Sequence, residues 1–207
     1  MIKAVYGLPG TGKTTLLSIA AYKWTHGKSF LGIPPADLVF TNFSCPGCYK
    51  LDFDTLGLYN YCSCNIIIDE IMLLCDCRAY KSFPDHLRDF FALHRRSKTN
   101  VLWCSQSWGD TDLKIKNLTE EYFLLDKLPL LSCFSIVKPI VKSLGIGKKG
   151  DSYTIAPPLS WIWVFRPKWY KLFDSYESKL HSLPPPKLQM WDTLEKVEVG
   201  SLLDNPS

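Results

Sequence analysis

A phosphate-binding loop stands near the start of the chain. Residues 7–14 form an unbroken G-x-x-x-x-G-K-[ST] pattern, called the P-loop below. Its glycines allow successive backbone N–H groups to turn inward around an anion. Lys13 can reach the β- and γ-phosphates, and Thr14 offers a hydroxyl to Mg²⁺. We therefore expect a bound nucleoside triphosphate. The expected nucleotide contacts are Gly7, Pro9, Gly10, Thr11, Gly12, Lys13, Thr14 and Thr15.

An acidic pair follows a short run of isoleucines. Residues 66–68 read Ile-Ile-Ile and lead directly into Asp69 and Glu70. A buried strand would place Asp69 at its carboxyl end beside the P-loop, where the carboxylate could hold Mg²⁺ through water. Glu70 would then orient and deprotonate the attacking water. The pair favours hydrolysis over small-molecule kinase chemistry; the alternative is a strand that ends in two solvated acids.

Two further residues could complete such a site. Gln106 ends an apolar strand, and its amide would face the γ-phosphate as a sensor if that strand lay between those carrying the P-loop and Asp69. Arg95 ends a helix, where a cation is favoured by the helix dipole. The more specific hypothesis is that Arg95 is an arginine finger that enters a neighbouring subunit's site. Arg96 and Arg78 are weaker candidates for this role.

Strands and helices must alternate to position these residues. The expected strands are 2–6, 37–43, 65–70, 100–104 and 122–125. The expected helices are 13–24, 84–96 and 110–117. This alternation predicts a three-layer α/β domain with a mainly parallel sheet.

The residue pattern of the chain changes after residue 127. Residues 134–141 and 153–165 predict an appended β-hairpin, and 168–179 a closing helix. We expect 1–127 to form the core, 128–180 to complete the same domain, and 181–207 to be a proline-rich tail.

Basic and aromatic residues gather in the predicted hairpin. Its lysines could follow a nucleic-acid backbone, although a solvated hairpin tip is the favoured interpretation. Its aromatic side chains could stack on bases, but we expect them to fill a core beneath the hairpin. These residues are Lys138, Lys142, Lys148, Lys149, Trp161, Trp163, Phe165, Trp169 and Tyr170.

Composition sets wider limits. The 207 residues are 46% hydrophobic and 21% charged, as in an ordinary globular domain. A formal net charge of +4 permits a polyanionic partner without requiring one. No run of about 18 apolar residues predicts a transmembrane helix.

The cysteine spacing raises the question of a metal site. Cys45-x-x-Cys48 and Cys62-x-Cys64 could supply four thiolates to a structural zinc. The spacing of Cys62-x-Cys64, with one intervening residue, is shorter than that of most zinc sites. We therefore expect free or buried thiols, with zinc as the alternative, and we interpret Cys104 as a small core residue.

Taken together, these motifs resemble the zonular occludens toxin (Zot) domain shared by filamentous-phage assembly ATPases, and more distantly the FtsK/HerA group of DNA-pumping ATPases. The segments that carry the resemblance are 7–15, 66–70, 78–84, 90–96, 105–107 and 171–177. The resemblance implies a P-loop ATPase of the ASCE type with strand order 5-1-4-3-2, assembled as a homohexameric ring. It also implies a sensor at Gln106 and a finger acting between subunits, most like Arg95.

The function that we expect from this resemblance is an ATP-driven DNA translocase of viral or prophage origin. Its partners would be phage DNA and capsid, coat or assembly proteins, in the host cytoplasm, at the inner membrane face or with the virion. Filamentous-phage members continue into a membrane anchor, and we expect none within these 207 residues, so a portion of a longer protein and a packaging-motor relative both remain open. The rival functions are a P-loop small-molecule kinase and a non-motor scaffold that binds ATP.

Overall fold

A single mixed sheet organises the protein. The computed structural model describes residues 1–74, 84–109, 111–143, 152–172 and 188. Within these ranges nine strands form one sheet in the order β3-β2-β4-β5-β1-β6-β7-β8, with β9 also paired to β7. The strands are β1 (Ile2–Tyr6), β2 (Leu38–Thr41), β3 (Tyr49–Lys50), β4 (Cys64–Ile68), β5 (Asn100–Ser105), β6 (Glu121–Lys127), β7 (Phe134–Ser143), β8 (Ser152–Ile155) and β9 (Ile162–Phe165).

The core of the sheet is parallel. Strands β3, β2, β4, β5, β1 and β6 pair in parallel with their neighbours. Without the two-residue β3, the order read from β6 is β6-β1-β5-β4-β2, which corresponds to the implied order 5-1-4-3-2. Strand β5 therefore lies between β1 and β4, the arrangement that the role of Gln106 requires.

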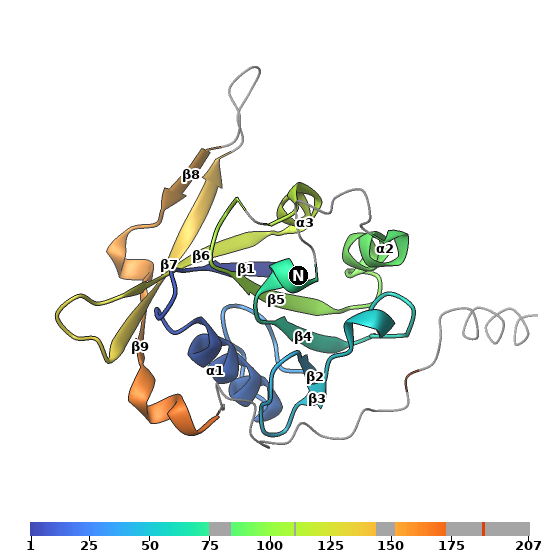
Figure 1. The fold of residues 1–207 in the computed structure, drawn as a ribbon, viewed down its shortest axis with the longest axis horizontal. Helices are drawn as coiled ribbons and strands as arrows, with labels where there is room; N and C mark the ends of the chain where they lie inside the picture. The colour runs from blue at the N-terminus through green and yellow to red at the C-terminus, as the bar shows by residue number, and fades with distance from the viewer. Residues whose placement is uncertain (75–83, 110, 144–151, 173–187, 189–207) are drawn as a thin grey trace, which may run out of the picture.

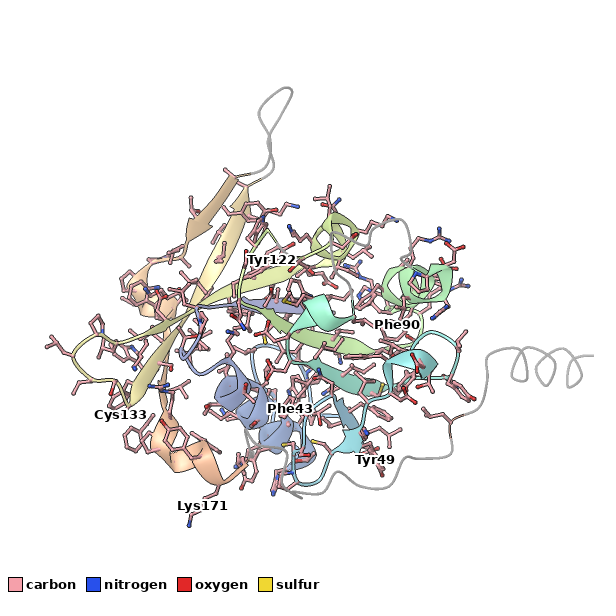
Figure 2. The ribbon with its side chains drawn as sticks, in the orientation of Figure 1. Phe43, Tyr49, Phe90, Tyr122, Cys133 and Lys171 are labelled. Atoms are coloured by element: carbon pink, nitrogen blue, oxygen red, sulfur yellow. The ribbon has the colours of Figure 1, made fainter. Side chains whose placement is uncertain are left out.

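Helices cover both faces of this sheet (Figure 1). Helix α1 (Lys13–Thr25) lies on one side, while α2 (Asp85–Leu93) and α3 (Leu113–Leu118) lie on the other. One apolar cluster joins α1 to the sheet, and a second joins α2 to the opposite face. Figure 2 shows side chains in both spaces, including Phe90 on α2. Strands β1 and β4 are buried throughout, as expected for parallel strands covered on both faces.

Short 3₁₀ helices occupy several connections. These are η1 (Phe53–Thr55), η2 (Ile71–Leu73), η4 (Pro158–Ser160) and η5 (Arg166–Leu172). The closing helix predicted over 168–179 is helical in its described part, where η5 is a 3₁₀ helix that begins directly after β9. Such tight turns suit short connectors. The rest of that prediction, from residue 173 onward, lies outside the described residues.

The appended strands extend the sheet instead of standing apart from it. Strand β7 pairs antiparallel with β6, and β8 and β9 pair antiparallel with β7. Alternation along a strand sends successive side chains to opposite faces. Val137 and Val164 accordingly pack in the cluster beneath α1, whereas Trp163 and Phe165 lie on the other face.

The expectation of an aromatic core beneath the hairpin is wrong for three residues. Trp163 is 56% exposed, Phe165 45% and Tyr170 49%. The strand alternation explains the first two, since the α1 cluster covers only the face that carries Val164. Trp169 does pack against that cluster, and Trp161 donates its indole N–H to Ala156 O at 2.9 Å.

The described lysines of the hairpin already have partners within the sheet. Lys138 Nζ lies 2.5 Å from Asp126 Oδ2 and stands over the ring of Trp161. Lys142 lies near the ring of Tyr153. Lys148 and Lys149 fall outside the described residues, as does the predicted tail apart from residue 188.

None of the helices in the described ranges is both long enough and apolar enough to cross a membrane.

Candidate nucleotide site

The P-loop leaves the carboxyl end of β1 and leads into α1. Gly7 N donates to Ser105 O of β5 at 3.3 Å, which anchors the loop to the neighbouring strand. Thr11 closes a turn by donating its hydroxyl to Leu8 O at 2.8 Å. Gly10 and Gly12 adopt φ angles of +77° and +95°, a region that favours glycine. The two glycines thus give the loop a shape that other residues would adopt only under strain.

The Lys13 side chain contacts both the P-loop backbone and the acidic pair. It is 7% exposed, and Nζ donates to Gly7 O at 2.9 Å. The same ammonium lies 3.7 Å from Glu70 Oε1. Burial of an ammonium group is tolerated where a carboxylate and carbonyl oxygens surround it. Lys13 is therefore held between the P-loop and the acidic pair.

Thr14 and Asp69 meet at the expected metal position. Thr14 Oγ1 donates to Asp69 Oδ2 at 2.6 Å, joining the start of α1 to the residue that follows β4. A hydroxyl and a carboxylate are oxygen donors of the type that Mg²⁺ prefers. The donor set therefore fits Mg²⁺. Thr15, the next residue of α1, is buried.

Asn42 holds the backbone of Asp69 in place. Its Oδ1 accepts from Asp69 N at 2.7 Å, and its Nδ2 donates to Asp69 O at 2.8 Å. Asn42 follows β2, which is the strand next to β4. Asn42 was not among the site residues expected from the sequence. Its available signal is a polar side chain directly after a buried strand, but the sequence does not say that this strand neighbours β4.

Cys104 has a second role besides core packing. Its Sγ donates to Asp69 Oδ1 at 2.8 Å and accepts from Glu70 N at 3.4 Å. Burial and the nearby Asp69 carboxylate raise the pKa of the Cys104 thiol, so the thiol remains protonated and able to donate. Both oxygens of Asp69 are consequently oriented, one by Cys104 and the other by Thr14.

Glu70 and Gln106 contact each other through their side chains. Gln106 Nε2 donates to Glu70 Oε1 at 3.0 Å. Glu70 has a φ of +55°, an uncommon conformation for a residue with a side chain. Its Oε2 is buried and accepts no hydrogen bond from any described residue. The strand order carries Glu70 and Gln106 into contact, because β4 and β5 are neighbours.

The alternative of a zinc site is wrong for this structure. Cys45 and Cys48 pack in the cluster beneath α1, whereas Cys64 packs in the cluster on the other face. Contact with Cys45 and burial raise the pKa of Cys48. Across the described ranges, the one convergence of metal-binding side chain types is Asp69, Glu70 and Cys104. The spacing of the cysteines did not reveal that the sheet separates them.

Arg95 lies at the opposite edge of the sheet. Its Nη2 is 3.4 Å from Glu120 Oε2, and its side chain is 73% exposed. Glu120 precedes β6 and also contacts His94 and the amino group of Met1. The structure thus brings Lys13, Thr14, Asp69, Glu70 and Gln106 together, and leaves Arg95 outside their group. Arg78, the other candidate, lies outside the described residues.

Comparison with known proteins identifies solved structures of similar fold. No protein-family model and no curated protein matches the chain. The N-terminal domain of zonular occludens toxin from Neisseria meningitidis aligns over 84% of this chain and 98% of its own, with a TM-score of 0.52 and 15% identity. The genome packaging NTPase B204 from Sulfolobus turreted icosahedral virus 2, in complex with ATP-gammaS, aligns over 66% and 90%, with a TM-score of 0.44 and 9% identity.

A KaiC-like protein from Pyrococcus horikoshii aligns over 75% of this chain and 89% of its own, with a TM-score of 0.40 and 14% identity. At these identities the match to the Zot domain concerns the fold. The chain therefore shares with that domain an α/β fold built on a mainly parallel sheet, and the predicted resemblance to the Zot domain is confirmed at that level.

Proposed function

We propose that this protein is a magnesium-dependent ATPase. The observation that carries the proposal is the convergence of Lys13, Thr14, Asp69, Glu70 and Gln106 at the carboxyl ends of β1, β4 and β5. Ligand sites of open α/β sheets lie at these carboxyl ends. The motif supplies the residue types, and the strand order supplies their contact.

Each residue has a distinct role in this proposal. The P-loop amides and Lys13 bind the phosphates, and Thr14 with Asp69 holds Mg²⁺, which would neutralise charge on the phosphate oxygens. Glu70 accepts the proton of the attacking water through Oε2, the oxygen that accepts no hydrogen bond from a described residue. Gln106 holds the other oxygen of Glu70 and senses the γ-phosphate through that contact.

The finer proposal is an oligomeric ring that translocates viral or prophage DNA in the host cytoplasm. It rests on the sequence resemblance to the Zot domain and on the shared fold. The exposure of Arg95 also supports it, because a finger that acts between subunits must be accessible to a neighbour. Phage DNA and capsid or coat proteins would be the partners.

The test is the substitution Glu70→Gln. It keeps the shape of the side chain and removes the base, so turnover should fall by about 10²–10⁴-fold while ATP binding is retained. Steady-state phosphate release and calorimetric ATP binding measure the two quantities. Asp89→Asn makes the same chemical change at an exposed carboxylate on α2 and should leave both unchanged. Unchanged turnover in Glu70→Gln would contradict the assignment.

Addition of DNA separates the rival functions. A translocase should hydrolyse ATP faster with DNA and show no response to small phosphate acceptors. A small-molecule kinase would show the opposite pattern. A scaffold would bind ATP without hydrolysing it, even as an oligomer.

A further inference from the structure

Two side chains from the appended strands contact the backbone of the P-loop. Ser135 of β7 donates its hydroxyl to Thr11 O at 2.5 Å. Arg166, the first residue of η5 directly after β9, donates Nη1 to Gly10 O at 3.1 Å. The paired residues lie 124 and 156 positions apart in the chain. The appended strands therefore reach the loop that binds phosphate.

The contact is close enough to restrict the loop sequence. A Cβ on Gly12 would lie 2.7 Å from Arg166 Cδ and 3.1 Å from Ser135 Oγ. The first distance is shorter than two carbon atoms allow. Gly12 is thus favoured by its left-handed backbone, and any side chain there would also displace Arg166.

Peptide geometry makes these contacts relevant to anion binding. In a trans peptide the C=O and the following N–H point in opposite directions. The hydrogen bond from Ser135 to Thr11 O therefore turns the N–H of Gly12 away from β7. In the same way, the bond from Arg166 to Gly10 O turns the N–H of Thr11 away from Arg166, and that N–H donates to Leu8 O at 3.3 Å within the loop. These bonds hold the backbone of the P-loop in one geometry, and P-loop amides bind an anion as a group.

The charge of Arg166 points to a ligand. Arg166 is 9% exposed, and its Nε is buried without a hydrogen-bond partner among the described residues. Within the same ranges no carboxylate forms an ion pair with it. A buried cation is costly unless an opposite charge compensates it. The phosphates of a nucleotide in the P-loop would supply that charge.

We infer that the appended strands belong to the phosphate-binding site, with Ser135 and Arg166 as positioning residues of the P-loop. Arg166 also adds positive charge to the site. This inference rests on the proposed function only in taking the ligand to be a nucleotide. Because binding and loop geometry are linked, nucleotide should in turn stabilise the pairing of β7 with β9.

The first test measures nucleotide affinity by calorimetry on the full chain, with ATP and with ADP. Arg166→Ala should weaken ATP binding by about 10- to 100-fold, the range for a lost charged hydrogen bond. Arg166→Lys keeps the charge and should recover part of this loss, whereas Ser135→Ala should cost a few-fold. Lys171→Ala, on the same 3₁₀ helix but directed outward (Figure 2), is the matched control and should bind normally.

The second test needs no substitution. Hydrogen exchange of wild-type peptides covering β7 and β9 should slow when ATP is added, and by less in Arg166→Lys. The inference is overturned if wild type binds ATP but these amides show no protection, or if Arg166→Ala is folded and binds ATP with unchanged affinity. Normal turnover in Glu70→Gln would overturn the proposed catalytic function and leave both of these measurements intact.

Discussion

The two edges of the central sheet carry contrasting clusters of charged residues. At the carboxyl ends of the strands, Glu70 contacts Lys13 and Gln106 through one oxygen, and no described residue bonds to the other. At the amino ends, Glu120 has partners on both oxygens. His94 and the amino group of Met1 contact Oε1, and Arg95 contacts Oε2.

The difference in carboxylate partners distinguishes the candidate site around Glu70 from the structural cluster around Glu120. A buried carboxylate oxygen without a partner is costly, and it persists where function requires it. Glu120 is instead compensated within the chain. Burial raises the pKa of its carboxyl, but the hydrogen bond with His94 and the positive charges of the amino terminus and Arg95 bring it below its ordinary value. The exposed guanidinium of Arg95 is the part of this cluster that a second subunit could reach.

The largest effect on turnover is expected from Arg95, which would act on the nucleotide site of a neighbouring subunit. If Arg95 is the finger, Arg95→Ala should lower turnover of the oligomer by about 10³-fold or more, with ATP affinity unchanged because Arg95 lies away from its own site. Mixing Arg95→Ala with Lys13→Ala should restore part of the turnover, because mixed rings place an intact P-loop beside an intact finger.

Arg96→Ala is the matched control for that experiment, since it removes a neighbouring exposed arginine. Full turnover in Arg95→Ala alone, or a mixture no more active than its components, would leave the amino-end cluster a purely structural feature.

A smaller effect is expected from the support of Asp69. Asn42→Ala leaves the backbone N–H and C=O of Asp69 without their present partners. Turnover should fall by about 10- to 100-fold, with more Mg²⁺ needed for half-maximal activity. Asn42→Asp should not rescue it, because a carboxylate cannot donate to Asp69 O. Asn117→Ala, an exposed change on α3, is the control; equal turnover in both alanine variants would show that Asn42 is dispensable.

The smallest effect concerns stability at the amino-end edge. Because the folded pKa of Glu120 is lowered, its stabilisation is present above the ordinary value of about 4.3 and is lost as the pH falls through the folded value. Glu120→Gln should lower the free energy of unfolding by under about 1 kcal/mol at pH 7. Urea unfolding should show this difference shrinking at pH 3; an equal difference at both pH values would exclude titration of Glu120 as its source.

The parallel core was predictable because its signals are local. Strand β1 was expected with the bounds that it has, and α1 exceeds its expected range by one residue. Apolar runs and a glycine-rich turn determine such elements within a few residues of chain. The exposed aromatic residues of β9 were not predictable in this way, because a period of two does not say which face another layer covers.

The residues of the candidate site also differ in whether local sequence could predict them. Lys13, Thr14, Asp69 and Glu70 belong to motifs with a recognisable spacing, and their contacts agree with it. Asn42 and Cys104 belong to no motif, and they join the site because β2 and β5 flank β4. Sequence spacing also suggested a set of zinc ligands in the cysteines that the sheet in fact keeps on separate faces.

The sequence by itself determined that a phosphate-binding loop, an acidic strand end and a polar strand end are present. Each is encoded in consecutive residues whose backbone geometry is local. Only the tertiary structure decided that Asn42, Cys104, Ser135 and Arg166 reach the same loop and acids. Their contacts depend on strand order and on the antiparallel return of β7 and β9, which long-range packing selects from many arrangements that local sequence equally allows.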